Sequence, residues 1–205
     1  MPLRNQLADF SQVGTMSGAS NAAATAGACH NFSLEWLSLI YKDSTDDGAV
    51  GRMMDLSKNR GGASMVTQAV FVNEWTRQGM EAADRGVSAW RGLEFVRDII
   101  PYSGYNLDNL VQALETTDIA GMLYSFWFSG SAIGASGGAH TIAFFRKVKS
   151  SRGRTGKADN TVLAFDPNFG ECWILEGNLS SWIEHMFSQY GPGTYHSLRG
   201  FKVRR

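Results

Sequence analysis

Cysteine is scarce in this sequence, which excludes the class of small disulfide-stabilised proteins. The 205 residues contain two cysteines, Cys29 and Cys172. Two are too few for a disulfide framework, and the sequence leaves open a single bond between them. Proline is also scarce, and the four prolines with 23 glycines indicate a structured chain with several tight turns.

The chain has no excess of charge of either sign and no long apolar run. Nineteen basic and nineteen acidic residues give a formal net charge of zero, so the charge balance gives no argument for nucleic acid or a strongly acidic partner. No segment reaches the ~18 consecutive apolar residues of a membrane span. The start, MPLRNQLADFSQ, lacks the apolar core of a secretory signal peptide. We expect a protein that acts in the cytosol of some cell or leaves by a route without such a signal.

One compact domain is expected after a lead-in. Small and polar residues without a period fill positions 11–28, SQVGTMSGASNAAATAGA, and such composition is typical of irregular chain. We therefore divide the chain into a flexible lead-in at 1–26 and a folded domain at 27–205. The sequence leaves open whether the lead-in is a secretion signal, a removable pro-segment or a fragment boundary.

The folded part changes from helical to strand-like patterns along the chain. Apolar residues at three- and four-residue spacings after Cys29 predict a helix. Further helices are expected at 62–83, 88–99, 107–116 and 180–190. Apolar runs bounded by turn residues predict strands at 121–128, 139–149, 160–167 and 172–175, with an edge strand from the tail HSLRGFKVRR. Helices followed by an antiparallel sheet define an α+β domain.

Three residues in this arrangement can form a nucleophile, a base and an orienting group. His140 begins one predicted strand and Asp166 ends the next, so an antiparallel hairpin brings them to the same end of the sheet. A carboxylate beside a histidine fixes its tautomer and stabilises the imidazolium. Cys29 opens a helix, where free N–H groups and the helix dipole favour the thiolate. The pattern predicts Cys-His-Asp chemistry.

The blocks around these residues resemble a known family. GACHNFSLEWL, GGAHTIAFFR and FDPNFGE are similar, in this order, to those of the YopT/AvrPphB-type cysteine proteases, which are papain-like bacterial effector enzymes. The resemblance spans about 27–173 and implies a papain-like fold in which Cys29, His140 and Asp166 are catalytic. It also implies a thiol protease without cofactors that a specialised secretion system delivers into the host cytosol, where it cleaves a specific host protein.

The oxyanion donor departs from the papain-like pattern. That pattern has a Gln or Asn a few residues before the nucleophile, but Thr25, Ala26, Gly27 and Ala28 stand there. The nearest amide is Asn21, which we take as the candidate donor, whereas Gln12 is distant in sequence. Loss of one oxyanion contact costs about 3 kcal/mol of barrier, so without this donor the basal activity would be low.

Each functional interpretation has a structural alternative. A cysteine on an apolar helix face is usually a core residue, and Cys172 is expected to be buried packing. His30 is expected to be exposed, His185 to be a surface or packing residue, and His196 has no evident partner. A zinc site from Cys29, His30, His140 and Cys172 lacks the usual ligand spacing. We expect no metal.

A cationic cluster lies on the hairpin between His140 and Asp166. Its simplest interpretation is a solvated turn, and the functional one is contact with an acidic protein surface or an anionic membrane. Few aromatic residues accompany it, so it does not indicate nucleic-acid binding. We expect a monomer that acts on a protein. The cluster consists of Lys147, Lys149, Arg152, Arg154 and Lys157.

Three hypotheses remain at this stage. The first is a cysteine endopeptidase. The second is a glutamine deamidase or a transglutaminase-like acyl transferase on the same triad, since the acyl-enzyme is shared and only the acceptor differs. The third is a catalytically inactive binding module on the same fold, which the unclear oxyanion donor supports.

Overall fold

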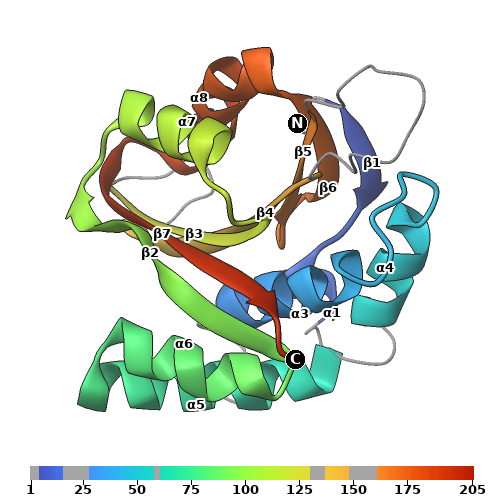
Figure 1. Cartoon of the computed structure of the whole chain (residues 1–205), viewed down its shortest axis with the longest axis vertical. Coiled ribbons are helices and arrows are strands. Elements are labelled where there is room, and N and C mark those ends of the chain that lie inside the picture. The colour runs from blue at the N-terminus through green and yellow to red at the C-terminus, as the bar shows by residue number, and fades with distance from the viewer. Residues whose placement is uncertain (1–4, 16–27, 58–60, 130–136, 148–160) are drawn as a thin grey trace.

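A seven-stranded antiparallel sheet forms the centre of the computed structural model, which describes residues 5–15, 28–57, 61–129, 137–147 and 161–205 (Figure 1). The strands are ordered β1-β6-β5-β4-β3-β7-β2 across the sheet. Their bounds are β1 (Gln6–Asp9), β2 (Leu93–Gly104), β3 (Gly121–Ser129), β4 (Gly137–Arg146), β5 (Thr161–Asp166), β6 (Gly170–Leu175) and β7 (Gly193–Val203).

Helices cover both faces of this sheet. In Figure 1, α3, α5 and α6 lie below the sheet and α7 and α8 lie above it. Because successive strand residues face opposite ways, Leu123 packs in the core with α3, whereas Met122 and Tyr124 pack in the core with α7 and α8. The helices are α1 (Gln12–Thr15), α3 (Cys29–Ile40), α4 (Ala49–Asp55), α5 (Gly61–Gln78), α6 (Met80–Ala89), α7 (Leu107–Thr116) and α8 (Leu179–Tyr190).

The predicted α+β class is confirmed, with the N-terminal helices packed on an antiparallel sheet. The helices at 29–40, 107–116 and 180–190 form close to their predicted bounds. At the start of the helix at 107–116, the side chain of Asn106 acts as the N-cap and accepts a 2.9 Å hydrogen bond from the Asn109 N–H. None of the described helices combines the length and the hydropathy that a membrane span requires.

The helix predicted at 88–99 is wrong, because most of this segment belongs to strand β2. Gly92 at φ +69° follows the end of α6, a backbone conformation that favours glycine. Leu93 and Phe95 are then buried in alternation with exposed neighbours. This period of two is typical of a strand.

Two smaller predictions also change. The helix expected at 62–83 is divided into α5 and α6 by Gly79, whose φ is +90°. The C-terminal strand β7 is not at an edge, because it lies between β3 and β2. The edges of the sheet are β1 and β2.

Part of the segment predicted as a lead-in pairs with the sheet. Strand β1 runs antiparallel to β6, and the Gln12 N–H donates to the Pro167 carbonyl over 2.7 Å. Residues 6–12 therefore lie against β6 and the turn between β5 and β6. A secretion or pro-segment role for residues 1–26 stays a prediction.

Candidate active site

Cys29 is the first residue of α3 and its side chain is partly exposed. One turn further along, Ser33 donates a 3.0 Å hydrogen bond to the Thr141 carbonyl of β4. This bond fixes the helix against the strand residue that follows His140. The Ser33 hydrogen bond and the packing of α3 on β4 therefore set the geometry between the thiol and the imidazole.

His140 and Asp166 meet as the hairpin pattern predicted. The His140 Nε2 donates to the Asp166 Oδ1 over 2.9 Å. His140 is 5% exposed and Asp166 is fully buried, so water does not weaken this bond. Because Nε2 faces the carboxylate, Nδ1 is the ring nitrogen left for Cys29.

The pKa values of the thiol and the imidazole move in the directions that favour an ion pair. Burial lowers the pKa of His140, but the charges of Asp166 and Cys29 and its hydrogen bonds to both raise it to about 10. Burial raises the pKa of Cys29, but the charge and hydrogen bond of His140, together with backbone hydrogen bonds from Thr141 and His30, lower it below its usual value. Both shifts favour a thiolate beside an imidazolium.

Tyr190 of α8 completes the surroundings of Asp166. Its hydroxyl lies 2.9 Å and 2.8 Å from the two carboxylate oxygens, and its ring stacks on the His140 ring at 4.8 Å between centroids. Asn168 Nδ2 donates to the same hydroxyl over 3.0 Å. Since the hydroxyl accepts from Asn168, its single proton is directed to Asp166. Tyr190 thus donates to the carboxylate and packs against the imidazole ring.

The FDPNFGE block builds the turn that supports this site. Gly170 has φ +115°, and a Cβ there would lie 2.0 Å from the Ala8 carbonyl oxygen, so only glycine permits this approach of β1. Glu171 is fully buried, pairs with Arg52, and accepts a 2.7 Å hydrogen bond from the Trp36 indole. The motif therefore joins three separate segments of the chain to the end of β5.

Gln12 lies at the site, although its distance in sequence indicated otherwise. Its Oε1 accepts a 2.9 Å bond from the Ala28 N–H, directly before Cys29, and its Nε2 donates a 2.7 Å bond to Asn168 Oδ1. Asn21, the predicted oxyanion donor, lies outside the described residues. Sequence spacing missed Gln12 because it lies sixteen positions before Ala28 in the chain. The pairing of β1 with β6 brings Gln12 to the site, and the sequence pattern does not show this pairing.

The remaining histidines and Cys172 have structural surroundings. His30 is not exposed as predicted: it is 2% exposed, bonds Asp84 through Nε2 over 2.7 Å, and stacks on Phe71. Cys172 is fully buried, as expected, and burial raises its pKa to about 12. Within the described residues, no three His, Cys, Asp or Glu side chains converge as a metal site.

Two further histidines differ in their surroundings. His196 is fully buried and contacts the rings of Tyr105 and Tyr124. His185 lies on α8 and is partly buried.

Only one member of the predicted cationic cluster is described. Lys147 forms an ion pair with Asp46 over 3.0 Å, so this lysine has a local acidic partner. The other four, Lys149, Arg152, Arg154 and Lys157, lie outside the described residues. Contact of the cluster with an acidic partner or a membrane stays a prediction.

Two solved structures resemble this one. The crystal structure of the Pseudomonas avirulence protein AvrPphB is similar with a TM-score of 0.59 and 18% sequence identity, over 93% of this chain and 100% of that chain. PatoxP, a cysteine protease-like domain of the Photorhabdus asymbiotica toxin PaTox, has a TM-score of 0.44 and 12% identity, over 96% of this chain and 54% of that chain. No family model and no curated protein matches the chain. The structure thus has the YopT/AvrPphB-type fold that the sequence resemblance implied.

Proposed function

We propose that this protein is a cysteine endopeptidase. The Cys29 thiolate attacks a peptide carbonyl, and the His140 imidazolium gives its proton to the leaving amine. A water molecule then gives a proton to His140 and hydrolyses the thioester, which restores the thiolate–imidazolium pair. Asp166 keeps His140 oriented and stabilises its positive charge throughout.

The observation that supports this proposal most is the position of one imidazole between a partly exposed thiol and a buried carboxylate. A core cysteine would have a raised pKa, as Cys172 has, whereas the pKa of Cys29 is lowered by the imidazole. Perturbed pKa values in opposite directions at one site are typical of catalytic groups.

The oxyanion would be stabilised by two N–H donors. The backbone N–H of Cys29 lies in the first turn of α3, where amides lack partners within the helix. We propose Gln12 as the side-chain donor in place of Asn21, because its amide is held next to Ala28 by two hydrogen bonds. Its Nε2 carries a second hydrogen besides the one that Asn168 accepts.

We propose further that the protein is a bacterial effector that cleaves a specific host protein after delivery into host cytosol. The support is the fold, shared with a protein named as an avirulence protein of Pseudomonas. We expect it to act as a monomer on a protein substrate, without a cofactor or nucleic acid. The cationic hairpin would contact an anionic surface of the substrate or of a membrane.

The test is a comparison of wild type with Cys29→Ser in lysates of plant and animal cells. Mapping of new protein N-termini by mass spectrometry should find cuts that only the wild type makes. Glutamine-to-glutamate conversion or attachment of an amine without a cut would indicate the deamidase or the acyl transferase. Identical proteomes with both proteins would contradict an active enzyme and favour a binding module.

A further inference from the structure

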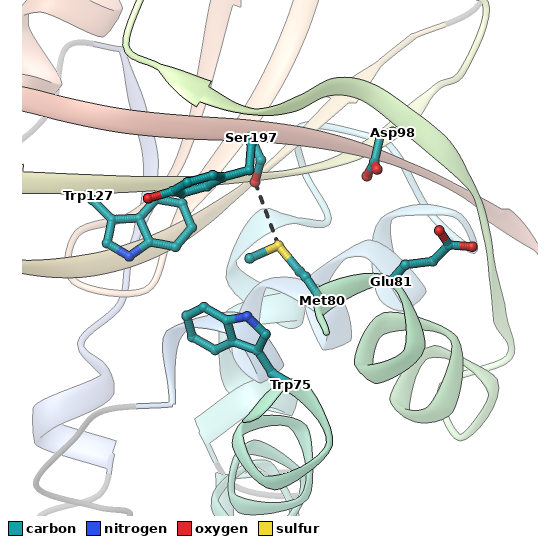
Figure 2. Close-up of a pocket in the computed structure, with 7 residues that line it drawn as sticks. Trp75, Met80, Glu81, Asp98, Trp127 and Ser197 are labelled. Carbon is teal, nitrogen blue, oxygen red and sulfur yellow. Dashed lines mark hydrogen bonds between the residues drawn. The ribbon is translucent and has the colours of Figure 1, made fainter. Parts of the chain in front are cut away.

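A pocket of about 310 Å³ lies between helices α5 and α6 and strands β2, β3 and β7, and it is not used by the chemistry proposed above (Figure 2). Three aromatic rings line it, from Trp75 of α5, Tyr102 of β2 and Trp127 of β3. Trp127 meets each of the other two edge to face, at 6.2 Å from Trp75 and 4.9 Å from Tyr102. Met80 and Ser197, joined by a hydrogen bond, complete this part of the wall (Figure 2).

Two carboxylates complete the lining. Glu81 comes from the start of α6 and Asp98 from β2, and Figure 2 shows both on the side of Met80 away from the two tryptophans. Glu81 forms an ion pair with Arg85 over 2.8 Å. Among the described residues, no ion pair to Asp98 is found within 4.0 Å. The pocket therefore has an apolar aromatic side and an acidic side.

The charges around the pocket leave an excess of negative charge. Arg199 is the buried cation nearby, and it is engaged by Asp84 over 2.6 Å. Burial raises the pKa of Asp98, the charge of Arg199 lowers it, and the charges of Glu81 and Asp84 raise it again. A bound cation would relieve this repulsion. The nearby guanidinium groups of Arg199 and Arg85 are already engaged by carboxylates.

The pocket wall lies two strands away from β4, the strand that carries His140. Thr141, directly after His140, is aligned with Ser125 of β3, and Ser125 is aligned with Ser197 of β7 at the pocket wall. Two strand spacings of ~4.8 Å place the wall about 10 Å from Thr141. An extended peptide advances ~3.3 Å per residue, so about three residues of a bound substrate would span this distance.

We propose that this pocket is a specificity site that binds an arginine side chain of the protein substrate. A planar guanidinium stacks on aromatic faces and pairs with carboxylates in a fork geometry, which a lysine ammonium does not match. The volume suits one side chain and lies at the lower end of the range for small-molecule ligands. The inference rests on the proposed function for the role of the pocket, but binding can be measured without cleavage.

The probe is N-acetyl-arginine methylamide, titrated into the wild-type protein while the tryptophan indole N–H signals are followed by NMR. We expect the signals of Trp75 and Trp127 to shift. Asp98→Asn should weaken the binding about tenfold, since a hydrogen bond to a charged group is lost. The matched control is Glu94→Gln on the same strand, which removes an exposed carboxylate paired with Lys202 over 3.6 Å and should leave the binding unchanged.

Three results would overturn the proposal. The first is that the uncharged isostere N-acetyl-citrulline methylamide binds as tightly as the arginine probe. The second is that the lysine analogue binds more tightly than the arginine probe. The third is that Asp98→Asn binds the arginine probe as tightly as wild type does. Cys29 alkylation separates this proposal from the proposed function. Rapid alkylation without arginine binding refutes the pocket alone, whereas arginine binding with slow, ordinary alkylation refutes the catalytic site alone.

Discussion

Replacing Asp166 with asparagine tests the electrostatics of the site. The pKa of His140 rises from 6.5 to about 10, and Asp166 is the largest of the groups that raise it. At ~1.4 kcal/mol per pKa unit, this rise corresponds to about 5 kcal/mol in favour of the imidazolium. Loss of one close opposite charge lowers a pKa by about 1–3 units. We therefore expect Asp166→Asn to remove about 1.4–4 kcal/mol of that preference.

The assay is an NMR titration of the His140 ring in wild type and Asp166→Asn. The direction of the His140 pKa shift also predicts how stability depends on pH. Because the folded-state pKa of His140 is raised, its contribution to stability is fully present below about pH 6.5 and is lost as the pH rises toward 10. The stability cost of Asp166→Asn should thus be largest at neutral and acidic pH and shrink toward pH 10. The matched control is Asp118→Asn, whose exposed carboxylate pairs with Arg97. An unchanged His140 pKa in Asp166→Asn would refute the reasoning.

Three further substitutions separate positioning from packing. Tyr190→Phe removes the hydroxyl bonded to Asp166, and we expect a loss of about 1.5–3 kcal/mol in unfolding free energy and slower Cys29 alkylation at pH 6. Gln12→Ala should lower kcat about a hundredfold or more with little change in the alkylation rate, because an oxyanion donor acts only in the transition state. Glu171→Gln leaves the buried guanidinium of Arg52 without its buried counter-charge, and only the half-exposed Asp43 remains at 3.9 Å, so chemical denaturation should reveal a loss of about 3–5 kcal/mol.

Each of these three substitutions has an outcome that would contradict the reasoning. Asp118→Asn, at an exposed ion pair, should cost no more than about 1 kcal/mol, and an equal cost for Glu171→Gln would contradict the buried network. For Gln12→Ala, a parallel fall in alkylation and kcat would indicate displacement of α3 rather than loss of an oxyanion donor. Unaltered alkylation at pH 6 in Tyr190→Phe would mean that the hydroxyl does not influence the ion pair.

Cys29, His140 and Asp166 could be predicted because the sequence patterns that place them are local. A helix start places Cys29, and a single hairpin brings His140 and Asp166 together by counting along two adjacent strands. Tyr190 and Gln12 could not be found this way. Tyr190 lies at the end of a helix packed over the sheet, and Gln12 depends on the pairing of β1 with β6.

The helix predicted at 88–99 was also wrong because the contacts that decide the structure there are distant in sequence. The segment of β2 has apolar residues whose local spacing also suits a helix, and the choice is made by pairing with β7, about a hundred residues later in the chain. Tertiary pairing of this kind overrides local preference. His30 was mispredicted for a similar reason, since Asp84 and Phe71 come from helices whose position on α3 the sequence pattern does not reveal.

The rate of Cys29 alkylation by iodoacetamide against pH, in wild type and His140→Ala, tests the central claim most directly. Cys172 serves as an internal control, since its burial and raised pKa should keep it unmodified. We predict that wild-type Cys29 reacts rapidly well below pH ~8.5, the usual thiol value, and that His140→Ala loses this reactivity. Equal rates in both proteins, with an ordinary thiol profile, would contradict the thiolate–imidazolium pair and the protease mechanism built on it.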